Sequence, residues 1–226
     1  MLKIASYNLH KCRGMTGPHA PLRNLAVIRE IDPDIIALQE VDFRYGARPE
    51  ALPRKLIQAE TGLVPADIFG TSESSLGWHG QTILMRPHLA EIATLRRLPL
   101  PGIEPRGAVA LRLPRLTVIG AHLGLARSSR RAQLARITAQ ASRIAEDHIV
   151  MMGDFNEWRD DRGLESLTGF KVLAPGPSWP APLPTLRLDR IAVSNNLEVL
   201  ETGVFSDTEA RQASDHLPIW AKIRMP

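Results

Sequence analysis

The chain has 226 residues, 44% of them hydrophobic, which is enough to bury one substantial core, so we expect a single domain over residues 1–226. Its apolar runs are too short to cross a bilayer and its first residues lack the pattern of an export signal, so we expect neither a membrane-spanning nor an exported protein. A formal net charge of +4 favours anionic partners, whereas 5% aromatic residues leave few rings on which single-stranded bases could stack.

The first predicted strand ends at a polar residue. Residues 1–7 are typical of a strand, and Asn8 follows them directly. The next loop contains the single cysteine, Cys12, which allows no internal disulfide and fits a reducing compartment, so we expect a cytoplasmic protein. Apolar residues at helical spacing then predict a helix over 22–31, which ends before Asp32-Pro33 because proline cannot continue it.

A second strand repeats this pattern. Residues 34–39 form an apolar run that ends at Glu40. A helix is expected over 51–61, with Gly62 as its C-cap, because glycine readily adopts the left-handed conformation that ends many helices.

Several short strands follow in quick succession. They are expected at 81–85, 108–113 and 116–122, and the last of them ends at His122. Connections this short favour strands that run in opposite directions, so part of the sheet structure should be antiparallel.

The clearest helix begins at Ser128 or Ser129, either of which could cap it. One face should pack against a sheet, and it carries Leu134, Ile137, Ala141 and Ile144. Three arginines are expected to face water, namely Arg130, Arg136 and Arg143.

The last third of the chain contains three more strands with polar neighbours. They are 148–152 before Asp154 and Asn156, 188–193 with Asp189, and 217–221 after Asp215 and His216. Between the first two, residues 174–184 alternate prolines with small residues around Trp179. This segment is either a stiff connection or a rim over a substrate.

Polar residues at strand ends gather at one edge of a sheet, where loops expose them and strands fix their backbones. Strands alternating with helices, then strands in series, predict an α/β protein with two mixed sheets packed face to face and helices outside. The ordered polar set resembles that of the endonuclease/exonuclease/phosphatase superfamily, which has the DNase I-like fold; the set is Asn8, Glu40, His122, Asp154, Asn156, Asp189, Asp215 and His216. The resemblance spans almost the whole chain and implies a four-layer α/β/β/α sandwich.

The resemblance also implies hydrolysis of phosphate esters, most simply by a phosphodiesterase. Such a reaction needs an in-line water, neutralisation of the phosphate charge and help for the leaving oxygen. Because carboxylates alone would repel the substrate, a divalent cation is expected, Mg²⁺ with Mn²⁺ as a substitute. Glu40 is the expected metal ligand, and Asn8 and Asp215 would complete or orient its shell.

Five residues are expected to perform the chemistry. By resemblance, Asp154 positions or activates the water, Asn156 holds the phosphate, and His216 pairs with Asp189 while contacting phosphate. His122 matches a position beside the phosphate. If Asp154 and Asn156 are considered by themselves, an ordinary turn after a strand explains them equally well. The assignment therefore depends on the whole set.

Arginines are expected to add phosphate contacts, principally Arg106 and Arg127. For Arg127, Arg130 and Arg131, surface salt bridges are an equally good explanation. The chain departs from many nucleases of the superfamily at His10, where an acidic ligand is common, and at Gln81, where a Gly-Asn pair is common.

The substrate remains open between a phospholipid-derived ester, a small-molecule ester and nucleic acid, because the same core chemistry serves all three. The alternatives are an endonuclease or exonuclease acting on DNA or RNA, and a catalytically silent phosphate-binding module. We expect no obligate protein partner.

Overall fold

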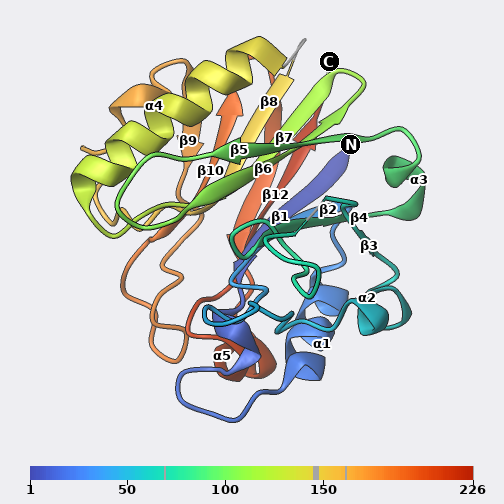
Figure 1. Ribbon diagram of the computed structural model, residues 1–226. Coiled ribbons are helices and arrows are strands. Elements are labelled where there is room, and N and C mark those ends of the chain that lie inside the picture. Colours follow the sequence, from blue (N-terminus) through green and yellow to red (C-terminus); the bar gives the residue numbers. More distant parts are fainter. Residues whose placement is uncertain (69, 145–147, 161, 226) are drawn as a thin grey trace.

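In this computed structural model, residues 1–68, 70–144, 148–160 and 162–225 are described, and within them the strands form two six-stranded sheets (Figure 1). The first sheet has the order β11-β12-β1-β2-β4-β3. Its strands are β1 (Leu2–Asn8), β2 (Ile35–Gln39), β3 (Val64–Pro65), β4 (Gln81–Met85), β11 (Glu198–Val204) and β12 (Ile219–Arg224).

The second sheet has the order β5-β6-β7-β8-β10-β9. Its strands are β5 (Thr94–Pro99), β6 (Gly107–Leu113), β7 (Leu116–His122), β8 (His148–Asp154), β9 (Phe170–Leu173) and β10 (Asp189–Ser194). Both sheets are mixed, because β1 runs parallel to β2 and β7 runs parallel to β8, while the other neighbours are antiparallel.

Helices cover the outer faces of both sheets (Figure 1). The helices of the described residues are α1 (Pro21–Ile31), α2 (Arg54–Thr61), α3 (Pro87–Ala90), α4 (Arg127–Ile144) and α5 (Thr208–Ala213), with 3-10 turns η1 (His10–Cys12) and η2 (Glu165–Leu167). The short helix α3 differs from the others, because its Leu89 belongs to the apolar cluster between the sheets. Buried residues of α1, α2 and α5 share one apolar cluster with the first sheet, and buried residues of α4 share another with the second. No helix in the described parts of the chain has both the length and the apolar composition needed to cross a membrane.

A third apolar cluster lies between the sheets. It joins residues such as Ile4, Ile35 and Ile83 of the first sheet to Val118 and Val150 of the second. Because the central strands are buried on both faces, their sequences read as nearly continuous apolar runs. The predicted four-layer α/β/β/α arrangement of two mixed sheets is confirmed.

Strand register brings the polar strand ends together. In the second sheet, Asp154 pairs with His122 on one side and with Asp189 on the other. In the first sheet, Asn8 pairs with Gln39, so Glu40 lies one residue beyond the paired position. Each sheet therefore presents its predicted site residues at the end of its central strands.

Three predicted element starts and one predicted side-chain orientation are wrong. The helix expected over 51–61 begins at Arg54, because the backbone N–H groups of Ala51 and Leu52 donate instead to the carbonyl of Val41, at 2.8 and 3.1 Å. Its predicted end is confirmed, since Gly62 is a left-handed C-cap with φ of 70°. The strand expected over 217–221 begins at Ile219, since the N–H of Leu217 donates to the carbonyl of Ser178.

The third correction concerns α4, which begins at Arg127 rather than at a serine. Arg136 and Arg143 are exposed as predicted, but Arg130 is buried. Its guanidinium donates to Glu157 at 2.8 Å, so an ion pair with a residue 27 positions away compensates its removal from water.

Gly153 allows β7 and β8 to approach beside the site. Its φ is 153°, and a Cβ built there would lie 1.8 Å from the carbonyl oxygen of Ala121, its partner on β7. Because the clash is with backbone in the middle of a sheet, Gly153→Ala should lower the free energy of unfolding by about 3 kcal/mol. Urea unfolding measures this loss. Gly169→Ala is the matched control, since a Cβ there meets nothing within 4 Å, and equal losses in the two variants would contradict the explanation.

Candidate active site

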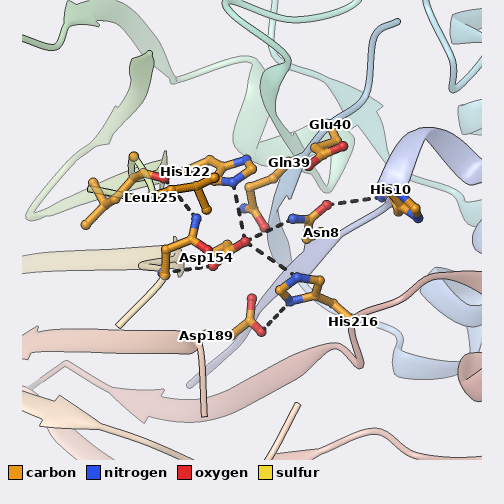
Figure 2. Close-up of polar contacts among 12 residues, drawn as sticks. Asn8, His10, Gln39, Glu40, His122, Leu125, Asp154, Asp189 and His216 are labelled. Atoms are coloured by element: carbon orange, nitrogen blue, oxygen red, sulfur yellow. Dashed lines mark hydrogen bonds and ion pairs between the residues drawn. The ribbon is translucent and has the colours of Figure 1, made fainter. Parts of the chain in front are cut away.

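Three side chains from different strand ends or loops converge on one oxygen of Asp154 (Figure 2). Asp154 ends β8 and its residue is 1% exposed. Its Oδ2 accepts a hydrogen bond from Asn8 Nδ2 at 3.0 Å, and it lies 3.4 Å from His122 Nε2 and 3.6 Å from His216 Nε2. The sequence-predicted residues Asn8, His122, Asp154 and His216 therefore form one buried cluster.

The other oxygen of Asp154 fixes the turn that follows β8. Oδ1 accepts the backbone N–H of Asn156 at 2.9 Å, and Asn156 has a φ of 53°. The Asn156 side-chain amide donates to the carbonyl of Leu123 at 2.9 Å. An amide nitrogen carries two hydrogens, so one donor of Asn156 is available for a ligand.

His216 and Asp189 form a hydrogen-bonded pair behind this cluster. His216 Nδ1 lies 2.9 Å from Asp189 Oδ2, which also accepts from the hydroxyl of Ser178 at 2.5 Å. Burial alone would lower the pKa of His216, but the charges of Asp189 and Asp154 and the hydrogen bond from Asp189 raise it to about 10. At neutral pH His216 is therefore an imidazolium whose Nε2–H faces Asp154.

Burial shifts the pKa values of His122 and Asp154 in opposite directions. Burial lowers the pKa of His122 to about 4 against the attraction of Asp154, so this imidazole is neutral at pH 7. Its Nδ1 is buried and has no hydrogen-bond partner among the described residues. Burial raises the pKa of Asp154, although the two neighbouring histidines oppose the shift. The site thus combines one cationic and one neutral imidazole around a single carboxyl group.

Two groups of side chains could hold a metal ion. The ligand atoms of Asp154, Asp189 and His216 lie within 4.8 Å of one another. Asp189 Oδ2 is already hydrogen-bonded to His216 and Ser178, whereas Asp189 Oδ1 is buried and has no hydrogen-bond partner in the described parts of the chain. A metal ion bound here would require His216 to lose its proton, because an imidazolium has no lone pair for a metal.

Glu40 offers the second, oxygen-based possibility. Burial alone would raise its pKa, but His122, Lys11 and His10 lower it to about 2, so it is ionised at neutral pH. Carboxylate and amide oxygens are the ligands that a hard cation such as Mg²⁺ prefers, and the amide oxygen of Asn8 accepts the backbone N–H of His10 at 3.1 Å. Among the described residues, no hydrogen bond or ion pair joins Glu40 to Asn8 or Asp215. The carboxylate of Asp215 instead contacts His10 Nδ1 at 3.7 Å and the hydroxyl of Ser214 at 3.4 Å.

Lys11 forms an ion pair with Glu40 and so places a cation beside the expected metal ligand. Replacing Lys11 by Met should raise Mn²⁺ affinity roughly three- to tenfold, because a partly exposed ion pair worth about 1 kcal/mol no longer competes with the metal. Calorimetry or Mn²⁺ paramagnetic resonance measures this affinity without any substrate. Exposed Lys55→Met controls for the lost charge, and an unchanged or weaker affinity in Lys11→Met would rule out this competition.

A cleft of about 90 Å³ opens next to the cluster, and both Glu40 and His122 line it. Arg106 also lines it, as predicted for a phosphate contact, and pairs with Glu104 at 2.8 Å. Arg127 is not among the lining residues; it is about half exposed and lies 3.6 Å from Glu165. The structure therefore brings Arg106, but not Arg127, to the predicted site.

Sequence reasoning missed Ser178 as a partner of Asp189. Ser178 lies in the proline-rich segment 174–184, whose neighbour Trp179 is half-buried and forms a bridge with Leu186 rather than lining the cleft. The segment is a connection that also delivers a hydroxyl to the site. No sequence signal marks this role, because the serine lies 11 residues from the carboxylate that it contacts.

Comparisons with known proteins agree with this fold. The sequence profile of a family described as the Endonuclease/Exonuclease/phosphatase family matches residues 5–216. The Escherichia coli K12 protein YbhP, described as uncharacterized, is 28% identical over 245 residues, covering 99% of this chain and 96% of that protein.

Solved structures have the same fold at low sequence identity. A zebrafish (D. rerio) TDP2 structure complexed with single-strand DNA product superposes with a TM-score of 0.72 at 16% identity, covering 99% of each chain. The mannosyl-6-phosphatase Bt3783 of Bacteroides thetaiotaomicron gives a TM-score of 0.73 at 17% identity, covering 100% of each chain.

Proposed function

The chain belongs to the endonuclease/exonuclease/phosphatase family and has the DNase I-like fold, and from this premise we propose that it is a metal-dependent phosphohydrolase, specifically a phosphodiesterase. The observation that carries the proposal is the convergence of Asn8, His122 and His216 on Asp154 Oδ2, with Asp189 behind His216. A buried carboxylate held between two imidazoles is suited to proton transfer and to orienting water.

In this proposal each residue has a separate task. Asp154 aligns the attacking water and accepts its proton. The His216 imidazolium, held by Asp189, donates from Nε2 to a phosphate oxygen and offsets developing negative charge. The neutral amide of Asn156 donates to the phosphate without adding negative charge, and neutral His122 contacts it beside Asp154.

A divalent cation would be held by Glu40, with Asn8 and Asp215 supporting it, and it would neutralise phosphate charge and polarise the ester when bound. Arg106 would bind a further phosphate oxygen, provided that it exchanges or shares its contact with Glu104.

Limited grip on duplex DNA is supported by the pairing of the basic residues on α4. Arg127 and Arg131 lie within 3.6 and 3.7 Å of Glu165, and Arg130 is bound to Glu157. Arginines already paired with carboxylates contribute less to neutralising DNA phosphates. The fold neighbours named above include both a DNA-product complex and a sugar phosphatase, so they favour neither substrate class.

The test is an ester panel that includes aryl phosphodiesters, aryl phosphomonoesters, phospholipids, inositol phosphates, DNA and RNA, each with Mg²⁺ or Mn²⁺. We expect diester hydrolysis that chelation abolishes and added metal restores, because phosphate and carboxylates repel each other without a cation. Full activity after exhaustive chelation would refute the metal requirement.

Two other outcomes would change the assignment. Efficient nicking of duplex DNA, with activity falling steeply with salt, would identify a nuclease instead. Metal binding without turnover of any ester would identify a silent phosphate-binding module.

A further inference from the structure

A second hollow adjoins the reactive cleft. It has a volume of about 480 Å³, and it shares Lys11, Phe43 and Arg44 with the cleft. Arg13 and Tyr45 also line it. Because the two hollows share wall residues, a molecule whose phosphate occupied the cleft could extend into the second space, which we call the arginine cavity.

Only some of the basic side chains around the two hollows have a carboxylate partner. Lys11 is paired with Glu40 and Arg106 with Glu104. The nearby carboxylate of Asp42 is occupied by the backbone N–H groups of Leu76 and Gly77, at 2.7 and 3.0 Å.

Three guanidinium groups remain without a carboxylate. Within the described parts of the chain, no ion pair engages Arg13, Arg44 or Arg48. Arg13 lies over the ring of Phe43, 5.7 Å from its centroid, and Arg48 approaches His79 Nδ1 at 3.4 Å. Desolvation and the Arg48 charge lower the pKa of His79 and so favour its neutral form, and a histidine offers no negative charge to Arg48 in either form. Glu104 on the cleft wall interacts electrostatically with Arg44 but forms its ion pair with Arg106. An anion entering here would therefore meet cations that no carboxylate pairs with directly.

The loop that carries two of these arginines is held in place. Its ends are joined by a bridge between Asp42 and Glu50, and Phe43 N–H donates to the Pro49 carbonyl at 2.9 Å. The carbonyl of Ala47 accepts from the hydroxyls of Ser72 and Ser74, and that of Arg48 accepts from Ser75 at 2.7 Å.

Backbone strain occurs at the same place. Arg48 and His79 have φ values of 50° and 49°, a region that residues other than glycine seldom adopt. Strained residues persist where the surrounding structure fixes them and are concentrated at ligand-binding sites. Because the backbone of this loop is already ordered, little backbone entropy is lost when its arginines bind an anion.

We propose that the arginine cavity binds a second anionic group of the substrate, a phosphate or carboxylate carried on the ester beyond the scissile phosphate. Arg44, on the wall that both hollows share, and Arg48, which lines the cleft beside that wall, supply the charge-assisted hydrogen bonds, with Arg13 of the arginine cavity alongside. Phe43 and Tyr45 contact the apolar part of the same ester group. This subsite rests on the proposed function for its role in specificity, but its preference for a second anion is a binding property that can be measured separately.

The binding test uses probes that cannot be hydrolysed. In Mg²⁺, calorimetry compares propane-1,3-bisphosphonate and 3-phosphonopropionate with propylphosphonate, which lacks the second anion. We expect at least one two-anion probe to bind about tenfold more tightly to the unaltered protein, the equivalent of about 1.4 kcal/mol. The double variant Arg44→Gln/Arg48→Gln should lose that preference. The relative affinities of the two probes show whether the second group is phosphate or carboxylate.

A matched control is Arg136→Gln/Arg143→Gln, which removes the same charge from exposed positions of α4 and should keep the preference. Equal binding of all three probes by the unaltered protein would overturn the proposal. So would a preference that persists in Arg44→Gln/Arg48→Gln, or one lost equally in the control, since the latter would reflect only net charge.

Kinetics separate failure of the subsite from failure of the proposed function. Two p-nitrophenyl diesters, one ending in a hydroxyl and one in a phosphate, should differ in kcat/KM, and Arg44→Gln/Arg48→Gln should reduce the ratio about tenfold. An unchanged ratio would overturn the subsite while leaving hydrolysis established. No hydrolysis of either ester would count against the proposed function, and the phosphonate affinities would still decide whether the arginine cavity binds a second anion.

Discussion

Asp154→Asn should lower ester turnover by about 10³-fold and leave the fold intact, because an amide has the shape of the carboxyl group but cannot accept the proton of water. The expected loss is large since three side chains are positioned by Asp154 Oδ2. Asn8 Nδ2 can still donate to the oxygen of the new amide. His216 loses one of the two carboxylates that raise its pKa.

The measurement pairs steady-state turnover with thermal unfolding of the same preparation. Asp67→Asn is the control, because Asp67 is an exposed carboxylate outside the residues that line the cleft, and it should affect neither quantity. If Asp154→Asn keeps turnover within tenfold of the unaltered protein while remaining folded, Asp154 does not handle the water.

His216→Ala should lower turnover by roughly 10²- to 10³-fold, because it removes the cation facing Asp154 and the phosphate. Asp189→Asn should act through His216, so turnover by the double variant Asp189→Asn/His216→Ala should be little lower than turnover by His216→Ala alone. Its free-energy cost is therefore expected to be well below the sum of the two single costs. Fully additive costs would contradict a working pair.

The imidazole resonances of His216 provide a readout that a purely structural role for Asp189 would not change. The pKa of His216 should be near 10 in the unaltered protein and should fall in Asp189→Asn, because the attraction of the Asp189 charge and its hydrogen bond are removed. Ser178→Ala, which deletes only the hydroxyl donor to Asp189 Oδ2, should change the pKa of His216 much less. Titration near the ordinary histidine pKa in the unaltered protein would refute the pairing.

Most strands and the identities of the clustered residues were predictable because apolar runs ending in polar residues leave a local signal. Residues 81–85 match β4, and Asn8, His122 and Asp154 stand at the ends of β1, β7 and β8. The catalytic and metal-binding roles assigned to this set stay predictions, as does the division of the chain into a single domain.

Other features carried no local signal. Arg130 has the spacing of a water-facing helix residue, yet it is buried because Glu157 comes from the loop after β8. Ser178 and Lys11 look like ordinary loop residues, and only their contacts with Asp189 and Glu40 bring them to the site. Arg127 was expected either to contact phosphate or to form a surface salt bridge, and the start of α4 places it against Glu165.

The sequence by itself determined which segments are buried on both faces and which chemical groups stand at their ends, because strand burial and turn formation depend on neighbouring residues. Tertiary structure decided the rest. The pairing of Asp154 with both His122 and Asp189 requires β8 to lie between β7 and β10, although β10 begins 35 residues after β8 ends. Packing of the two sheets then brings Asn8 of the first within 3.0 Å of Asp154 in the second. Such distances follow from sheet order, register and layer packing, which are set by contacts between segments far apart in the chain.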